Sequence, residues 1–163
     1  MDQASIDALR AQPVPAQGHL IGGQMVPASD GGVMETSSPI DGRVLTTLAK
    51  GTGADVARAV AVAREAFEDG RWSRLHPSER KAVLIRLAKL LTRNARELAV
   101  MESLDSGKTI YDCETVDVPE TINCIKWHAE LIDKIYDQVS PASDDHIAMV
   151  VREPVGVVGL VLP

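Results

Sequence analysis

The run from Val155 to Leu162 restricts the fold of this chain more than any other stretch. It contains only valine, glycine and leucine, so neither face of a strand formed here would present a polar side chain to water. Such a run is typical of a strand buried on both faces, inside a parallel sheet that helices cover. Parallel neighbours come from further βαβ units, each with a crossover of about a dozen residues or more. Because the sequence ends at Pro163, we expect it to be the front part of a larger α/β protein.

The acidic composition limits the classes of partner. The 163 residues carry a formal net charge of −6 and no basic cluster, which argues against a nucleic-acid partner. No segment has the length of a signal peptide's apolar region or of a membrane span. Cys113 and Cys124 match neither a zinc site nor a disulfide scaffold, which favours a reducing compartment. We therefore expect a soluble, cytoplasmic protein with no membrane partner.

The first fifty residues predict an arm followed by a ribbon. Residues 1–17 are polar and rich in Ala, Gln and Pro, so we expect a disordered or extended arm. Residues 18–50 contain short β-capable runs separated by turn signals, among them Gly22-Gly23 and the segment from Pro39 to Gly42. These signals predict a small antiparallel β ribbon.

Residues 51–140 change to the helical period of about 3.6 residues. Thr52 and Asp55 predict a capping box at the start of a helix that ends near Gly70. His76-Pro77 predicts the start of a second helix, since proline is tolerated in a first turn.

Asn94 and Glu97 predict a second capping box, where the second helix breaks and restarts before ending at Gly107. The remaining expected elements are a helical stretch over residues 110–139 with a joint at Pro119, a strand over residues 145–154 and the buried strand over residues 155–163.

Five segments resemble the N-terminal part of the aldehyde dehydrogenase superfamily. In chain order they are SSPIDGRVL, DVARAVAVAREAFEDGRWSRLHPSERKAVLIRLAKLL, ELAVMESLDSGK, VDVPETINCIKWHAELIDK and REPVGVVGLVLP. The resemblance is strongest to bacterial enzymes that oxidise amino aldehydes or γ-glutamyl-γ-aminobutyraldehyde in polyamine breakdown. It implies an α/β protein with an incomplete aldehyde dehydrogenase fold, which comprises a β ribbon, a helical bundle, an oligomerisation strand and the first strand of a Rossmann-like sheet.

The resemblance also implies an activity for the complete enzyme, which uses NAD or NADP to oxidise a small-molecule aldehyde to a carboxylic acid. The cofactor would lie near the strand end formed by Val161, Leu162 and Pro163. In the family, the catalytic asparagine, glutamate and cysteine lie beyond the position of Pro163. We therefore assign no catalytic residue and expect the chain alone to be inactive. The family also implies a homo-oligomer, paired through a β element that corresponds to residues 146–153.

The cysteines and histidines of this chain do not form a catalytic group on sequence grounds. Cys113 and Cys124 fall in predicted helices, where we interpret them as small packing residues. His128 follows Trp127 and is interpreted as a packed or surface histidine. The four histidines have no spacing that converges on a metal.

The resemblance implies a structural Na⁺ or K⁺ site at Thr36, Ser37 and Asp105. In the family, backbone oxygens of a strand and an aspartate bind such an ion, and a further carbonyl comes from beyond the position of Pro163. The alternative interpretation is that Asp105 caps its helix end or a neighbouring turn.

Asp117 and Glu120 are three residues apart and would share a helix face. In the family this helix lines the aldehyde entrance, and branches that accept amino aldehydes resemble this sequence in placing carboxylates at these positions. The pair would attract a cationic group of the substrate. The alternative is a solvated acidic helix start, where negative charge is favourable.

A second hypothesis from a different class stays open. The short chain could be a stand-alone, non-catalytic interaction protein derived from an aldehyde dehydrogenase, which offers its β segments to a full-length relative. The nucleotide sequence after the Pro163 codon distinguishes the two, because an in-frame continuation that begins Trp-Asn supports the enzyme fragment.

Overall fold

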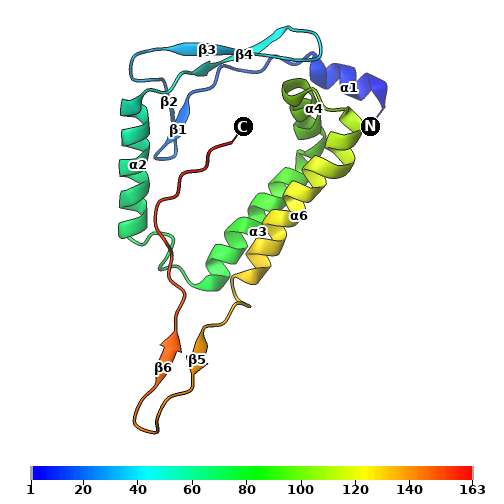
Figure 1. Ribbon diagram of the computed structural model, residues 1–163. Coiled ribbons are helices and arrows are strands. Elements are labelled where there is room, and N and C mark those ends of the chain that lie inside the picture. The colour runs from blue at the N-terminus through cyan, green and yellow to red at the C-terminus, as the bar shows by residue number, and fades with distance from the viewer. Residues whose placement is uncertain (1, 163) are drawn as a thin grey trace.

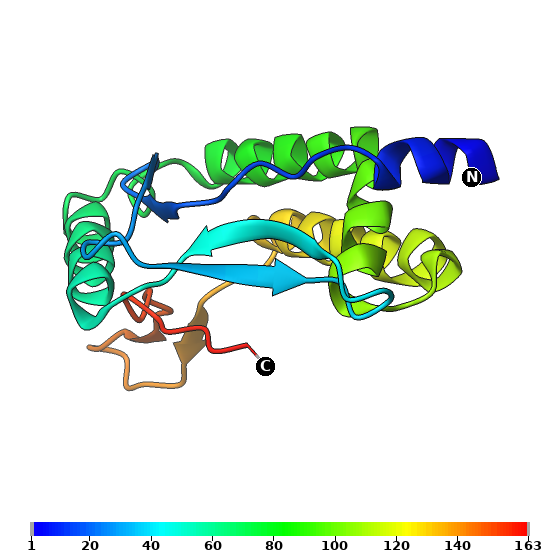
Figure 2. The ribbon, with the colours of Figure 1, turned by 90° about the horizontal axis from the view of Figure 1, so that it is seen from above.

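The computed structural model describes residues 2–162 and places a β ribbon across one end of the molecule, with helices along two sides (Figure 1). A hairpin projects from the opposite end, and the C-terminal segment returns from it past α2. Seen from above, the ribbon runs between α2 and α4 (Figure 2). The elements in chain order are α1 (Gln3–Arg10), β1 (His19–Ile21), β2 (Gln24–Val26), β3 (Val33–Ser37), β4 (Val44–Ala49), α2 (Gly53–Glu68), α3 (Pro77–Arg93), α4 (Ala95–Ser106), α5 (Ile110–Asp112), the π-helical turn η1 (Cys113–Asp117), α6 (Val118–Leu131), β5 (Gln138–Ser140) and β6 (Ala148–Val150).

The ribbon consists of two antiparallel pairs, as its turn signals predicted. Gly22 and Gly23 join β1 to β2 with φ angles of 61° and 78°, a region that L side chains rarely adopt. Gly42, with φ of 74°, closes the turn between β3 and β4. The register of β3 and β4 shifts between Thr36 and Ser37, which bends the ribbon at this bulge.

The arm predicted over residues 1–17 is helical over Gln3–Arg10, so the prediction of a disordered or extended segment was wrong there. Asp2 caps α1 by accepting a hydrogen bond from the Ser5 backbone N–H at 2.8 Å. The half-buried Ile6 and Leu9, three residues apart, lie on the same side of α1, which packs against α4. Tertiary packing therefore stabilises a short helix that the composition did not indicate.

The starts of α2 and α3 follow the sequence signals. The Thr52 side chain accepts from the Asp55 backbone N–H, and the Asp55 carboxylate accepts from the Thr52 N–H at 2.9 Å, which confirms the capping box. The same carboxylate accepts from the Ser29 N–H at 3.0 Å and so ties the ribbon to α2. Pro77 begins α3, and Gly70 has the positive φ expected after the end of α2.

The chain breaks at Asn94 as predicted, but the second capping box does not form. Asn94 makes no side-chain cap for α4. Its Nδ2 instead donates to the Leu90 carbonyl at 2.8 Å, at the end of α3. The amide therefore satisfies an acceptor of the preceding helix rather than a donor of the following one. Gly107 ends α4 with φ of 78°, as expected.

The helical stretch predicted to reach residue 139 ends at Leu131, so its last part was wrong. Pro119 lies in the first turn of α6, directly after η1, which agrees with the predicted joint. Residues 138–140 form β5, which pairs antiparallel with β6. Cross-strand pairing thus replaces the helical turns expected from the apolar spacing.

The core lies where α3, α4, η1 and α6 meet. Ala99, Cys113 and Ala129 are completely buried there. Small side chains at these positions let the helices approach closely. None of the helices within residues 2–162 is long and apolar enough to cross a membrane.

The C-terminal segment departs most from the prediction. The strand expected over residues 145–154 is limited to Ala148–Val150, and residues 155–162 form no strand at all. Val155 and Val161 are 96% and 94% exposed, rather than buried on both faces. A parallel strand exists only through hydrogen bonds to neighbours, and no other described strand pairs with this segment.

Candidate functional site

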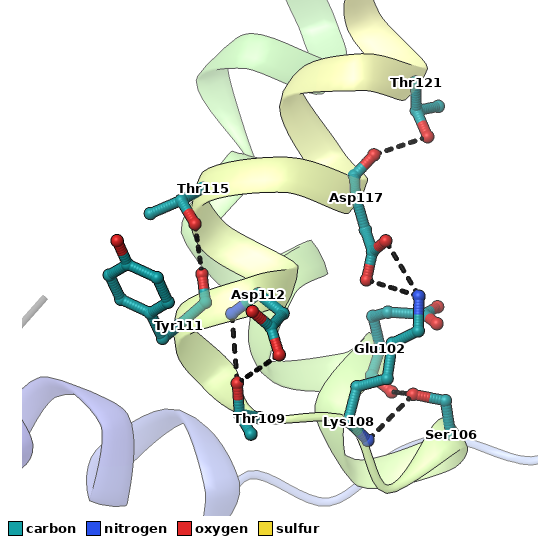
Figure 3. Close-up of polar contacts among 9 residues, drawn as sticks. All are labelled: Glu102, Ser106, Lys108, Thr109, Tyr111, Asp112, Thr115, Asp117 and Thr121. Carbon is teal, nitrogen blue, oxygen red and sulfur yellow. Dashed lines mark hydrogen bonds and ion pairs between the residues drawn. The ribbon is translucent and has the colours of Figure 1, made fainter.

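Asp117 ends the π-helical turn η1 and is held by a lysine (Figure 3). Lys108 Nζ lies 2.8 Å from Oδ1 and 2.9 Å from Oδ2 of this carboxylate, so one ammonium contacts both oxygens. The Asp117 side chain is 27% exposed and that of Lys108 is 53% exposed. The hydrogen bonds that Lys108 donates to Asp117 raise the pKa of the Lys108 ammonium above its ordinary value, and the charge of Glu102 acts in the same direction. Lys108 is therefore firmly cationic at neutral pH.

Glu120 has a different environment, although it is only three residues further along. It lies in the first turn of α6 and is exposed. The helical path from η1 into α6 is continuous, so Asp117 and Glu120 face the same side of it. Within residues 2–162 no hydrogen bond or ion pair engages the Glu120 side chain. The structure thus brings both predicted carboxylates to one side, with only Asp117 neutralised.

Lys108 was not identified from the sequence. It follows Gly107, whose φ of 78° turns the chain sharply at the end of α4. That turn lets a residue nine positions before Asp117 reach its carboxylate, a separation outside the three- and four-residue spacings of a helix face. The positive-φ glycine before a lone lysine was the only available signal.

Cys113 is a packing residue as interpreted from the sequence, whereas Cys124 is exposed, so that interpretation was wrong for Cys124, and His128 is a surface residue. Cys113 is completely buried, and burial raises the pKa of its thiol, with the charge of Asp117 acting in the same direction. Such a thiol is a poor nucleophile. Cys124 is exposed, and His128 Nδ1 lies 2.8 Å from its carbonyl oxygen, which requires the ring to donate to its own helix. Among residues 2–162 no group of three or more His, Cys, Asp or Glu side chains is arranged to hold a metal ion.

Two of the three residues proposed for an alkali-metal ion are in contact. Thr36 Oγ1 donates to Asp105 Oδ1 at 3.1 Å, across β3 and α4. Both residues line a cavity of about 360 Å³, whose other walls include the apolar side chains of Leu45, Leu98 and Met101. Ser37 follows at the bulge of β3 and is exposed. The hydrogen bond from Thr36 ties the end of α4 to the bulge of β3.

The residues predicted to lie near the cofactor are at the end of the extended C-terminal segment. Val161 and Leu162 are exposed, at 94% and 72%. Pro163 lies outside the described residues. No titratable side chain lies among these three positions.

Comparisons with known proteins agree with one another on the family. Residues 25–163 match the sequence profile of the aldehyde dehydrogenase family. Aminoacetaldehyde dehydrogenase of Pseudomonas aeruginosa is 57% identical over 136 residues, which cover 83% of this chain and 27% of that protein. The NADP/NAD-dependent aldehyde dehydrogenase PuuC of Escherichia coli is 42% identical over 143 residues, covering 88% of this chain and 29% of that enzyme.

Solved structures are similar along nearly the whole chain. The crystal structure of γ-glutamyl-γ-aminobutyraldehyde dehydrogenase from Burkholderia cenocepacia superposes with a TM-score of 0.92 at 43% identity, covering 96% of this chain and 32% of that one. The chain therefore spans between about a quarter and a third of the length of these relatives. From the profile match, the sequence identities and the shared fold together, the chain belongs to the aldehyde dehydrogenase family.

Proposed function

We propose that this chain is part of an NAD- or NADP-dependent aldehyde dehydrogenase that oxidises an amino aldehyde to the corresponding carboxylic acid. The observation that carries the proposal is the 57% identity to aminoacetaldehyde dehydrogenase. The similarity to PuuC, whose name includes both cofactors, supports either NADP or NAD. The similarity to a γ-glutamyl-γ-aminobutyraldehyde dehydrogenase supports an amino aldehyde or a γ-glutamylated amino aldehyde as the substrate. A role in polyamine breakdown and a place in the cytoplasm belong to the proposal through the family resemblance of the sequence.

The contribution of this chain to the reaction is substrate recognition. The acidic entrance that contains Asp117 and Glu120 attracts the distant ammonium of an amino aldehyde and orients the aldehyde end away from these carboxylates. The cofactor, when bound, accepts the hydride from the aldehyde carbon. Val161, Leu162 and Pro163 suit a place beside it, because their apolar side chains carry no charge that would repel its phosphates.

A structural Na⁺ or K⁺ ion at Thr36, Ser37 and Asp105 is part of the proposal. The Thr36–Asp105 hydrogen bond supports this ion site, because it places a hydroxyl oxygen and a carboxylate oxygen close together at the bulge of β3. Oxygen ligands suit hard cations.

The hairpin of β5 and β6 supports a homo-oligomer. It projects from the rest of the molecule, and Val139, Ile147 and Met149 are 73%, 81% and 65% exposed on it. Exposed apolar side chains and free strand edges favour pairing with another chain.

The same hairpin supports the second candidate function, a non-catalytic protein that pairs with a full-length relative. Co-expression with such a relative tests it: a mixed oligomer that survives purification favours this function, and strict separation contradicts it.

The enzyme proposal is tested by exchanging segments. In what we call the exchange enzyme, residues 25–162 of this chain replace the matching segment of the P. aeruginosa aminoacetaldehyde dehydrogenase. We expect cofactor reduction with a higher kcat/KM for an ω-amino aldehyde than for a neutral aldehyde of equal length. A folded exchange enzyme that reduces no cofactor, or that prefers the neutral aldehyde, contradicts the proposal.

A further inference from the structure

We infer that Lys108 makes Glu120, rather than Asp117, the entrance carboxylate that recognises the cationic end of the substrate, because Lys108 neutralises Asp117. This inference rests on the proposed function and deepens it. It assigns a specificity-determining role to a residue that contacts neither end of the aldehyde. The two carboxylates therefore have different roles, although they lie on the same helix face.

The geometry gives Lys108 the place that a substrate ammonium would take on Asp117. Its Nζ contacts both carboxylate oxygens, at 2.8 and 2.9 Å, and this arrangement uses the favourable positions for a single cation (Figure 3). Asp117 is also the less exposed partner. A substrate ammonium must displace Lys108 to bind there, and it would leave one cation unpaired next to another.

The backbone of Lys108 is fixed on both sides, so its side chain starts from a defined position. Its carbonyl accepts a hydrogen bond from the buried Ser103 Oγ at 2.7 Å. Its N–H donates to Ser106 Oγ at 3.3 Å. The preceding residue, Gly107, has a positive φ, a conformation that would be strained for a residue with a side chain. The ion pair is therefore preorganised, unlike that of a lysine on a mobile loop.

Charge also favours Lys108 in this position. Glu102, on the last turns of α4, contributes a negative charge near the ammonium, in addition to that of Asp117. Lys108 and Asp117 together present no net charge to an approaching substrate. Glu120 is exposed, and no cation within residues 2–162 pairs with it.

The test is a set of charge-removing variants in the exchange enzyme, read as KM and kcat for an ω-amino aldehyde and a neutral aldehyde of equal length. Glu120→Gln should raise KM for the amino substrate about fivefold and leave kcat and the neutral substrate unchanged. Asp117→Asn should raise it about threefold, because it leaves the Lys108 cation unpaired near the substrate. The double variant Lys108→Met/Asp117→Asn should return KM to within about twofold of the parent, since both charges are removed.

The double variant decides between the alternatives. If it stays as impaired as Asp117→Asn, then Asp117 binds the substrate directly and the inference is overturned, while the proposed function stands. If no variant, including Glu120→Gln, changes the two substrates differently, the proposed function itself is contradicted. Glu130→Gln, a carboxylate removal at the far end of α6, is the matched control and should change neither KM.

A second measurement needs no enzyme activity. In the exchange enzyme labelled with ¹³C at lysine, the ¹³Cε chemical shift of Lys108 followed against pH should give a higher pKa than in its Asp117→Asn variant. Equal values in the two proteins would show that the ion pair does not form in solution, and the inference would fail.

Discussion

Asp117 and Cys113 show how the surroundings of single residues decide their chemical roles in this chain. Both belong to η1, but Asp117 faces a lysine ammonium, whereas Cys113 is enclosed by helices. Enclosure disfavours the thiolate, so the cysteine that lies nearest to the proposed entrance is a packing residue. This agrees with its interpretation from the sequence.

Removing both entrance carboxylates should change the preference between charged and neutral substrates. In the exchange enzyme, Asp117→Asn with Glu120→Gln should raise KM for an ω-amino aldehyde about tenfold. The value of kcat should stay nearly unchanged, because the distant ammonium is bound equally in the ground and transition states. Steady-state kinetics at low and high salt measure both effects, and salt should shrink the difference between the substrates. Equal losses for charged and neutral aldehydes would mean that the pair supports the helix instead.

Helical spacing predicted that Asp117 and Glu120 share a helix face, because residues three apart do so whatever the tertiary structure. The same spacing could not predict Lys108. Its approach depends on the turn at Gly107, and a sequence does not specify which way such a turn directs the following residue. The contact between Thr36 and Asp105 is another case, since the family resemblance placed both residues near one site but did not indicate a hydrogen bond between them.

At the scale of elements, local signals located the starts of α2 and α3 and the helix ends at Gly70 and Gly107, but not the cap of α4 or the end of α6. Thr52 and Asp55 form their capping box because both partners lie within one turn. Asn94 stands between two helices, and its amide could serve either; the structure uses it for the carbonyl of Leu90. The end of α6 was misplaced because the apolar residues after Leu131 also suit a strand, and pairing with a segment ten residues later decides between the two.

An ion pair between α3 and the turn that follows α6 should make the free energy of unfolding depend on pH in acid. Asp133 accepts from Lys81 Nζ on α3 at 2.9 Å and from Lys134 Nζ at 3.0 Å. These hydrogen bonds lower the pKa of Asp133 from 3.8 to about 2. A lowered pKa in the folded state contributes stability above the unfolded pKa, and this contribution is lost as pH falls from about 4 towards about 2.

Urea unfolding followed by circular dichroism measures the effect. Between about pH 5 and pH 3, the unfolding midpoint should fall less in Asp133→Asn than in the unmodified chain, because the variant has no carboxyl to protonate. Glu130→Gln serves as the control and should retain the full pH dependence. An identical pH dependence in Asp133→Asn and the unmodified chain would show that the ion pair does not stabilise the helix contact.

At the scale of the whole molecule, the order of ribbon, helices and a following strand agrees with the sequence prediction, whereas the hairpin partner β5 and the exposure of the last segment do not. Apolar character is a local property that the sequence reports directly. Burial depends on what covers the segment, and no described element covers Val155 or Val161. The apolar sequence therefore predicts that this segment needs a covering element, but it does not identify that element.

The isolated chain should not behave as a stable monomer. The segment from Val155 to Leu162 and the faces of several helices expose large apolar side chains, which favour association. Size-exclusion chromatography with light scattering should show species larger than 17.5 kDa, together with binding of a hydrophobic dye. Val158→Lys with Leu160→Lys should reduce both. Sharp, dispersed amide signals from a dilute monomer would contradict the expectation.

The isolated chain should also fail to oxidise aldehydes. Its buried Cys113 thiol is a weak nucleophile. The Sγ atom of the exposed Cys124 lies 3.6 Å from His128 Nδ1, but that nitrogen donates to the Cys124 carbonyl and therefore carries a proton, so it is not a base for the thiol. Incubation with amino aldehydes and NAD or NADP should give no increase in absorbance above the background at about 340 nm, where the reduced cofactor absorbs. Turnover that persists in Cys113→Ser and Cys124→Ser variants would mean that another group of this chain performs the chemistry.

The contrast between the two cysteines provides an intrinsic reporter. A maleimide dye should modify Cys124 within seconds to minutes and leave Cys113 unmodified while the helices remain closed around it. The slow second phase of labelling would then time the opening of the π-helical turn that also holds Asp117. Two stopped-flow traces, one with and one without an amino aldehyde, would therefore show whether ligand binding at the entrance slows the opening of the turn beneath it.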